Sequence, residues 1–373
     1  MKHHFSRNFK YLICLFVFFA AFSLFICAGD GEIFRSSVVE AKVTQESSVF
    51  GSEHVVFGRA NPNIRAVIAV QNRYTEFLLE EPGILGTATG LTKDGRPAIL
   101  VFAKSYELAR TAAIPASIED VPVIVKITGQ IKALKAPSSK GKVPKPSPVD
   151  PTARFDRPVP IGVSTGHPAI TAGTIGCRVT DGIDVYALSN NHVYADENKA
   201  LPGEDVLQPG TYDGGEEPAD SIGTLFDFQP IVFSTLANNE IDAAIALSST
   251  AELGNATPSD GYGKPKSTPV DAKIGLTVMK YGRTTSQTKG KVYAINATVD
   301  VSYDTGVARF VNQIVITPGN FSAPGDSGSL IVVQKGKDAR KPVGLLFAGG
   351  GGFTFANPID SVLNMLGVTI DGD

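Results

Sequence analysis

A serine flanked by glycines is the residue in this chain best placed for chemistry. Ser327 stands in the run Pro324-Gly-Asp-Ser-Gly-Ser-Leu330. A serine hydroxyl is a weak nucleophile unless a base removes its proton and nearby N–H groups stabilise the oxyanion. Glycines on both sides allow a tight turn that aims the Gly325 and Ser327 amides at one point. The run predicts a nucleophile with its oxyanion hole, although Gly-Asp-Ser-Gly alone also occurs in surface turns.

The base for such a serine should be a histidine held by a rigid element. His167 and His192 lie in the C-terminal half of the chain. His167 belongs to an early loop, whereas His192 directly follows an apolar run that ends at Ser189 and has the pattern of a strand. A general base must be held in position, and the end of a strand provides that support. We therefore expect His192 to be the base.

A carboxylate is then needed to orient the imidazole and to stabilise its charged form. Asp242 opens the apolar run 242–247, where an unpaired carboxylate would be costly. The rival aspartates lie in polar or Gly- and Pro-rich surroundings that indicate solvent exposure: Asp205, Asp213, Asp220 and Asp227. Asp242 is the expected third member.

The elements that would position these residues are mainly β-strands. From residue 161 onward, short apolar runs alternate with turn signals, and about a dozen strands predict one all-β barrel or sandwich unit. The last helical stretch is 361–366. The earlier part is mixed, with helices expected at 64–79 and 105–112 and strands at 85–91, 97–102 and 121–128. This pattern predicts a small α+β domain.

Four segments follow from these patterns. Residues 1–29 carry basic residues before a long apolar run, which predicts a signal peptide or a membrane anchor. Residues 30–134 form the α+β domain of unknown role, and 135–158 form a Pro-rich linker. Residues 159–373 hold the β-rich unit with the candidate triad. In either reading of the first segment, the body of the protein lies outside the cytoplasm.

Composition narrows the function further. The chain has 373 residues, with 34 Lys and Arg against 37 Asp and Glu, a balance that argues against a nucleic-acid partner. Cys14 and Cys27 fall in the N-terminal segment, so a processed chain keeps Cys177 alone and forms no intrachain disulfide. Cys177 lies in an apolar strand-like stretch and is expected to be a buried structural residue. No cluster has the spacing of metal ligands, so neither metal nor cofactor is expected.

The order His192, Asp242, Ser327 resembles that of the chymotrypsin-like (trypsin-like) serine proteases. Three further motifs fit the same family: Lys280-Tyr-Gly-Arg-Thr-Thr285, Val343-Gly-Leu-Leu-Phe-Ala-Gly349 and Phe355-Ala-Asn-Pro-Ile359. More narrowly, the chain resembles bacterial proteins related to the plant narrow-leaf protein. The resemblance implies a double six-stranded β-barrel and a serine endopeptidase that works through an acyl-enzyme intermediate.

The resemblance also implies supporting roles. In bacterial members of the family, the arginine of Gly-Arg-Thr-Thr pairs with the aspartate before the nucleophile, so Arg283 is expected to pair with Asp326. The residue six positions before the nucleophile lies at the base of the primary specificity pocket. Pocket residues are therefore expected to be Phe321, Ser322, Phe347, Ala348 and Gly349. Cleavage after uncharged side chains is expected, with a preference for glutamate as the alternative.

Other functions stay open at this stage. A trypsin-like scaffold without activity could bind partners, and an esterase could use the same triad on small esters. The expected partner is a protein or peptide substrate. Contact with a membrane is expected only through a possible anchor in the N-terminal segment. The N-terminal domain could be a pro-region, a targeting module or a module for forming a homo-oligomer.

Overall fold

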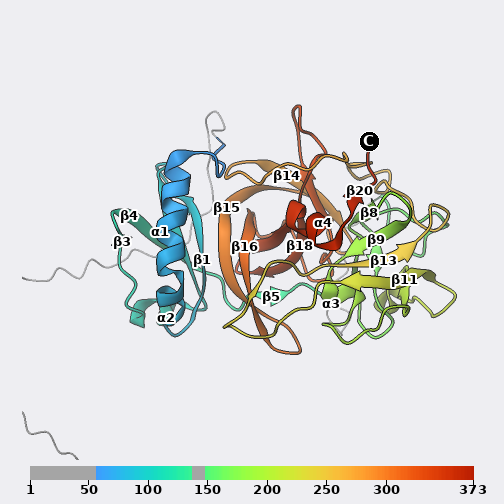
Figure 1. The fold of residues 1–373 in the computed structure, drawn as a ribbon, viewed down its shortest axis with the longest axis horizontal. Coiled ribbons are helices and arrows are strands. Elements are labelled where there is room, and N and C mark those ends of the chain that lie inside the picture. The colour runs from blue at the N-terminus through green and yellow to red at the C-terminus, as the bar shows by residue number, and fades with distance from the viewer. Residues whose placement is uncertain (1–55, 137–147) are drawn as a thin grey trace, which may run out of the picture. The chain divides into compact units, whose positions relative to one another are not determined.

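The computed structural model describes residues 56–136 and 148–373, all of which fall in one compact unit spanning Ala41–Asp373 (Figure 1). The expected signal peptide or anchor at 1–29 lies outside the described residues. Among the residues that the structure describes, no helix is both long enough and apolar enough to span a bilayer.

The N-terminal region packs one long helix on a small sheet. Helix α1 (Pro62–Leu79) begins after Asn61, whose side chain accepts hydrogen bonds from the backbone amides of Asn63 and Ile64. Its apolar face packs on β1 (Ile84–Leu91) and β2 (Pro97–Ala103), as Figure 1 shows. The remaining elements of this region are α2 (Tyr106–Thr111), β3 (Ser117–Ile118) and β4 (Val121–Ile127), with β4 parallel to β2. The expected mix of helices and strands is therefore present.

This region continues a sheet of the β-rich part instead of forming a separate sheet. Strand β1 pairs antiparallel with β15 (Ser286–Ser302), which joins the two parts in one 12-stranded sheet. The buried Gln71 of α1 adds a polar link, because its amide donates to the Thr87 hydroxyl and to the backbone carbonyl of Asn296. Backbone pairing between β1 and β15 thus links the expected α+β domain to the β-rich unit.

Six strands of the 12-stranded sheet pair with one another in a ring. In ring order they are β14 (Thr277–Gly282), β15, β16 (Val307–Thr317), β19 (Phe353–Pro358), β18 (Pro342–Gly350) and β17 (Leu330–Val333). Two short strands attach to this ring: β12 (Asn238–Asn239) pairs with β16, and β5 (Lys132–Ala133) pairs with β15 and β18.

The second sheet has six strands and runs open from edge to edge. Its order is β10 (Asp205–Leu207), β11 (Ser221–Phe228), β13 (Ala244–Ser248), β9 (Val185–Ser189), β8 (Cys177–Thr180) and β20 (Thr369–Ile370). The shorter elements of this half are β6 (Ser164–Thr165), β7 (Gly173–Thr174), α3 (Asn191–Tyr194), the 3-10 turn η1 (Thr211–Asp213) and α4 (Ile359–Leu366).

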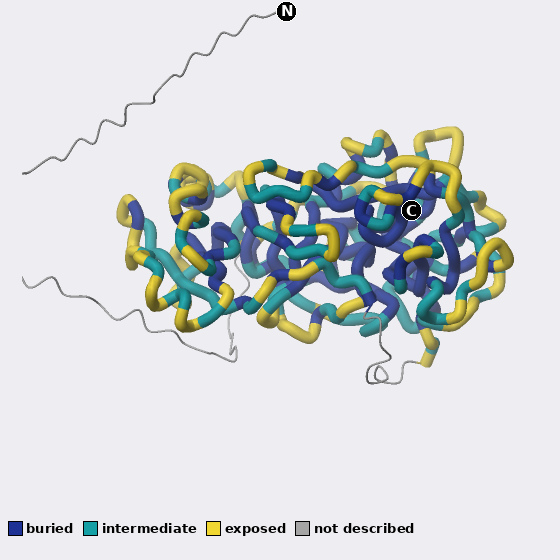
Figure 2. The backbone as a smooth tube through the Cα atoms, turned by 90° about the horizontal axis from the view of Figure 1, so that it is seen from below, coloured by how far each residue is buried: buried dark blue, intermediate teal, exposed yellow. Residues whose placement is uncertain are grey.

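The expected mainly β fold is confirmed, with one difference in detail. The ring matches the expected six-stranded barrel, but the pairings of the other sheet do not close, because β10 and β20 remain its two edges. Each half has a buried apolar core, visible as dark tube in Figure 2. Cys177 lies in the core of the open sheet as a free, fully buried thiol, and burial raises its pKa. The thiol is held in its neutral form, as a structural role requires.

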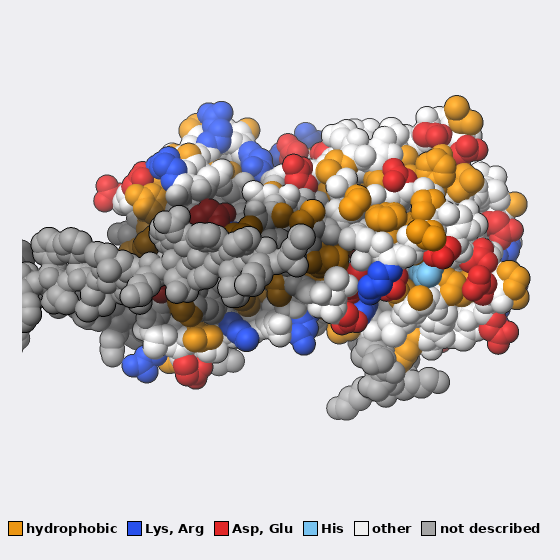
Figure 3. Space-filling view, turned by 60° about the horizontal axis from the view of Figure 1, so that its bottom comes forward, with side chains coloured by type: hydrophobic (Ala, Val, Ile, Leu, Met, Phe, Trp, Pro, Cys, Tyr) orange, Lys and Arg blue, Asp and Glu red, His pale blue; other side chains and the backbone are white. Residues whose placement is uncertain are grey.

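The described ends of the expected linker are attached to the folded unit. Lys135 and Ala136 lie against the β-rich part, and after the gap Arg154 makes a two-pronged ion pair with Asp220, at 2.6 Å for both N–O distances. On the face shown in Figure 3, basic and acidic side chains are intermixed with apolar ones.

Candidate active site

His192 and Asp242 are brought together by the pairing of two strands. Strand β9 ends three residues before His192, and β13 begins two residues after Asp242. Ser189 of β9 lies opposite Ala244 of β13, so the two catalytic candidates extend from the same end of this strand pair. The His192 Nδ1 atom lies 2.5 Å from Asp242 Oδ2, and the His192 amide donates to Oδ1 at 3.2 Å. Both side chains are fully buried.

Asp242 has a further partner that the sequence did not reveal. The Tyr303 hydroxyl donates to Asp242 Oδ2 at 2.9 Å, and the Tyr303 ring meets the His192 ring edge-on with centroids 5.9 Å apart. Burial, with the charge of Asp242, raises the pKa of Tyr303 well above its usual value, so the hydroxyl stays protonated and can donate. Tyr303 follows β15 in a turn with no recognisable motif, so only its tyrosine hydroxyl could have drawn attention to it.

Ser327 lies in the turn that leads into β17 and is fully buried. Its hydroxyl donates to the Phe347 carbonyl at 3.2 Å, and its own carbonyl accepts a hydrogen bond from the Thr174 amide at 2.8 Å. The His192 Nε2 atom is buried and has no hydrogen-bond partner among the described residues. In this arrangement the Ser327 hydroxyl is bonded to Phe347 and not to His192.

Gly173 of β7 shows how closely the loops of His192 and Ser327 approach each other. A Cβ atom added to Gly173 would lie 2.5 Å from Val193 Cγ2 and 3.1 Å from the Ser327 carbonyl oxygen. Val193 follows His192 directly, so a residue without a side chain is what lets the base and nucleophile loops meet here.

The Asp326 carboxylate is buried beneath the nucleophile and fully satisfied. Its oxygens accept hydrogen bonds from the backbone amides of Ala323, Thr284 and Thr285, and from the Thr285 hydroxyl at 2.7 Å. The cation beside it is Lys280 of β14, whose Nζ lies 3.2 Å from Asp326 Oδ2, with both side chains fully buried. Burial lowers the pKa of Lys280, and the Asp326 charge opposes that shift.

The expected pairing of Arg283 with Asp326 is corrected by these contacts. The Arg283 guanidinium instead makes two 2.6 Å hydrogen bonds to Asp213 of η1 and lies 5.1 Å from the centre of the Tyr212 ring. Lys280 points inward from a strand and occupies the position beside Asp326, so the guanidinium fork extends across to η1. Asp213, expected to be solvated, has a side chain that is only 8% exposed.

Arg283 nevertheless lies against the candidate oxyanion loop. Gly325 has a φ of +101°, and an added Cβ would lie 2.3 Å from the Thr284 hydroxyl and 2.7 Å from Arg283 Nη1. Only glycine suits this backbone conformation and this space. The Gly325 amide donates to the carbonyl of Leu134 at 2.5 Å. This amide therefore already holds a peptide carbonyl, as an oxyanion donor would.

The expected pocket residues do not all belong to one apolar cluster. Phe321 is fully buried in an apolar cluster to which Leu134 is also packed, and Gly349 lies beside Leu134. Phe347 and Ala348 belong to a different cluster, which also contains Phe310. The remaining pocket candidate, Ser322, shares a 2.6 Å hydrogen bond with Thr354.

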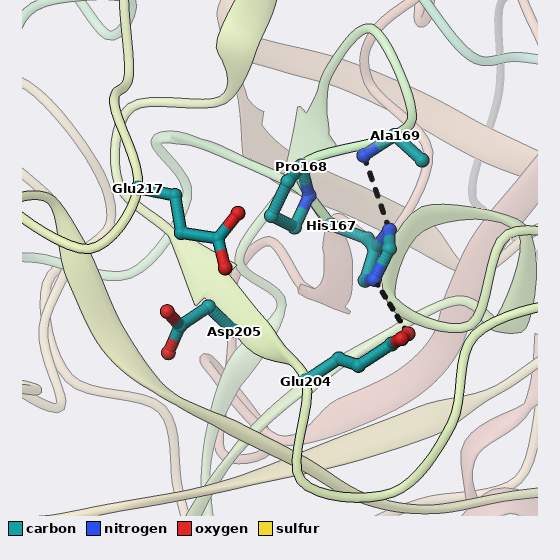
Figure 4. Close-up of a pocket in the computed structure, with 6 residues that line it drawn as sticks. All are labelled: His167, Pro168, Ala169, Glu204, Asp205 and Glu217. Atoms are coloured by element: carbon teal, nitrogen blue, oxygen red, sulfur yellow. Dashed lines mark hydrogen bonds and ion pairs between the residues drawn. The ribbon is translucent and has the colours of Figure 1, made fainter.

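His167 is engaged elsewhere. It lines a pocket of about 350 Å³ with Glu204, Asp205 and Glu217, shown in Figure 4. There its Nε2 lies 3.0 Å from a Glu204 carboxylate oxygen, while Nδ1 accepts from the Ala169 amide. Both ring nitrogens of His167 have partners, so His192 remains the candidate base. Within 56–136 and 148–373, no group of three or more His, Cys, Asp or Glu is arranged to hold a metal ion.

One protein family has a domain that matches the part of the chain containing the six-stranded ring. Residues 246–355 match the Nal1 C-terminal domain. This Nal1 C-terminal domain match begins within β13 and ends in β19, so it includes Ser327, Asp326 and Lys280. His192 and Asp242 precede it. The match is consistent with the expected resemblance to relatives of the narrow-leaf protein, and it covers the part of the chain that carries Ser327, the candidate nucleophile.

Solved structures with distant likeness are serine proteases. A glutamic acid specific serine protease is 21% identical, with a TM-score of 0.42 over 57% of this chain and 100% of its own. Thermobifida fusca protease A is 17% identical, with a TM-score of 0.42 over 58% and 99% of the two chains. Cellulomonas bogoriensis chymotrypsin is 19% identical, with a TM-score of 0.40 over 59% and 100%. No curated protein matches the chain by sequence.

Proposed function

We propose that this protein is a serine endopeptidase whose triad is His192, Asp242 and Ser327. The proposal rests mainly on one hydrogen bond: the amide of Gly325, two positions before the buried Ser327, donates to the Leu134 carbonyl. The buried His192–Asp242 pair supplies the base on the same side of the molecule. The contact of the Gly325 amide with the Leu134 carbonyl supports an oxyanion-binding role for this amide.

The hydrogen bond to Asp242 gives the two nitrogens of His192 different roles. With Asp242 accepting from Nδ1, the neutral His192 carries its proton on Nδ1 and leaves Nε2 as the proton acceptor. Nε2 takes the proton as Ser327 Oγ attacks the peptide carbonyl, and it returns that proton to the departing amine. Water then hydrolyses the acyl-enzyme by the same route in reverse.

The oxyanion formed in each step lies against the Gly325 amide, with the Ser327 amide as the expected second donor. The loss of one such donor typically lowers kcat by about 10²–10³. Asp326 and Lys280 hold the loop that presents these amides, whereas Arg283 and Asp213 fix its outer side. Neither a metal nor a cofactor takes part in this scheme.

We also propose that the protein acts outside the cytoplasm, on the basis of the basic and apolar segment at 1–29. Mass spectrometry of the protein recovered from the cells that make it tests this proposal. A mature chain starting near Asp30 supports export with cleavage, and an intact chain in the membrane fraction supports an anchor.

Active-site labelling tests the enzymatic proposal. Ser327 is fully buried and lies close to Leu134, so the assay uses the Leu134→Ala variant, whose smaller side chain should loosen the segment over the site. A fluorophosphonate probe should label Ser327 in this variant, and adding Ser327→Ala or His192→Ala should remove both labelling and peptide hydrolysis. Ser117→Ala is the matched control, because Ser117 is exposed in the N-terminal region. Casein and nitrophenyl acetate as substrates separate the peptidase from an esterase. Labelling that persists after Ser327→Ala would contradict the proposal, and absent labelling of the Leu134→Ala variant would favour a scaffold.

A further inference from the structure

A segment of the chain itself lies across the candidate active site. We define it as the covering segment, Ile131–Ala136, which joins the N-terminal region to the expected linker. Its strand β5 pairs antiparallel with β18, with Ala133 opposite Ala348 and Lys132 opposite Gly349. In Figure 1, β5 leads from the N-terminal region toward α3. Adding a strand to a sheet edge is a common way for a protein to bind an extended peptide.

Leu134 is the residue held at the reacting position. Its amide donates to the Phe347 carbonyl at 3.0 Å, and its carbonyl accepts from the Gly325 amide at 2.5 Å. The Ser327 hydroxyl donates to the same Phe347 carbonyl at 3.2 Å. The nucleophile and the Leu134 amide therefore share one acceptor, which places the Leu134 carbonyl group next to Ser327.

The Leu134 side chain fills the apolar pocket. It packs against the cluster that contains Phe321, and a Cβ atom added to Gly349 would lie 2.9 Å from Leu134 Cδ1. Ser322 and Thr354, the polar groups considered for binding a glutamate, hydrogen-bond to each other. The pocket thus holds a leucine in apolar surroundings.

The chain is also held on the far side of the Leu134–Lys135 bond. The Ala136 amide donates to the Ala172 carbonyl at 3.0 Å, and the Thr171 hydroxyl donates to the Ala136 carbonyl at 2.7 Å. The Lys135 ammonium lies 3.5 Å from the buried Glu197 carboxylate and also pairs with Asp304. Both flanks of one peptide bond are fixed, with that bond at the nucleophile.

We propose that the Leu134–Lys135 peptide bond is an intramolecular substrate of this site. The inference rests on the proposed function. Ser327 and His192 are both fully buried, so in the uncut chain they are closed to external substrates. Cutting this bond frees the chain beyond Leu134 to leave the cleft. The pocket contents also give the substrate class: peptides with a leucine-sized apolar residue before the cleaved bond.

The reaction is an ordinary hydrolysis. Ser327 Oγ bonds to the Leu134 carbonyl carbon, and its proton passes through His192 Nε2 to the Lys135 nitrogen as the C–N bond breaks. Water then attacks the ester, giving a Leu134 carboxylate and regenerating the serine. One water molecule is consumed, and no oxidant, reductant or cofactor is needed.

The test follows the full chain after purification. Intact mass and N-terminal sequencing should show one fragment that ends at Leu134 and one that begins at Lys135. Their rate constant should not change over a tenfold range of protein concentration, because the substrate is in the same molecule. Ser327→Ala should yield neither fragment. A break at another bond, or a rate proportional to concentration, would overturn the proposal.

Leu134→Asp separates this proposal from the proposed function. A carboxylate in the apolar pocket should slow cleavage at 134–135 by about 100-fold or more. The same change should uncover the site, raising fluorophosphonate labelling and hydrolysis of the peptide Gly129–Ala136. Leu134→Ala is the milder second variant, and Leu201→Asp is the control, because Leu201 is 65% exposed.

Two outcomes distinguish a failure of the intramolecular proposal from a failure of the proposed function. If Leu134→Asp cleaves the Gly129–Ala136 peptide after leucine while the unaltered chain stays whole, the intramolecular proposal is wrong and the peptidase stands. If folded Leu134→Asp and Leu134→Ala neither react with the probe nor cleave the peptide, both proposals are wrong.

Discussion

Lys280 reaches from β14 to within 3.2 Å of Asp326, and both side chains are completely buried. The carboxylate beneath the nucleophile is therefore held by a lysine from the neighbouring strand. Four hydrogen bonds from three backbone amides and the Thr285 hydroxyl complete its surroundings. Because Gly325 and Ser327 flank Asp326, this buried pair holds the turn that carries the two amides proposed for the oxyanion hole.

Lys280→Met should destabilise the protein strongly, because it leaves the Asp326 charge buried without a cation. The expected loss is about 3–5 kcal/mol in the free energy of unfolding, which urea denaturation measures. The double variant Lys280→Met/Asp326→Asn should recover part of that loss. Equal losses in the single and double variants would show that the charge of Asp326 is not the cause.

Arg283→Ala and Asp213→Ala should have overlapping effects, because each removes the same two-pronged pair. A double-mutant cycle on the free energy of unfolding should give a coupling of about 1–3 kcal/mol. Arg283→Lys should recover little, since lysine cannot donate the parallel hydrogen bonds. Additive losses would contradict direct coupling between the two residues.

Tyr303→Phe should reduce peptidase activity while His192, Asp242 and Ser327 all remain. The variant removes one hydrogen bond to the Asp242 carboxylate, and a bond to a charged group typically contributes about 1.5–3 kcal/mol. We expect kcat/KM to fall about tenfold or more, measured in a chain with the cleft uncovered by Leu134→Ala. Tyr293→Phe is the control. Undiminished kcat/KM would show that Tyr303 does not help position Asp242.

Tyr303 also predicts a specific dependence of stability on alkaline pH. Burial, and after it the charge of Asp242, raises the pKa of Tyr303 in the folded state well above its usual value of about 10. Above about pH 10 the unfolded chain loses this proton while the folded chain keeps it, so stability falls as pH rises toward the folded pKa. Tyr303→Phe should lack this contribution. Urea denaturation of both proteins between pH 9 and about 11 compares the slopes, and parallel curves would contradict the assignment.

The sequence by itself pointed to the three candidate catalytic residues, because each lies in a recognisable local pattern. The glycines around Ser327, the strand before His192 and the apolar run after Asp242 are each readable along the chain. The spacing of apolar residues and the turn residues likewise predicted a mainly β fold, because both are local properties of the chain. His192 and Asp242 then meet because β9 and β13 pair in the register of Ser189 with Ala244.

Only the tertiary structure decided which charges pair and what occupies the cleft. Lys280 and Arg283 are three positions apart, yet one points inward to Asp326 and the other crosses to Asp213, 70 positions away in sequence. Tyr303 hydrogen-bonds to Asp242 from a turn whose sequence has no recognisable motif. Leu134 reaches the Gly325 amide because β5 pairs with β18 at residues 348–349, beyond the part of β18 that pairs with β17. Such contacts depend on which strands are neighbours and in what register, and local residue patterns do not specify either.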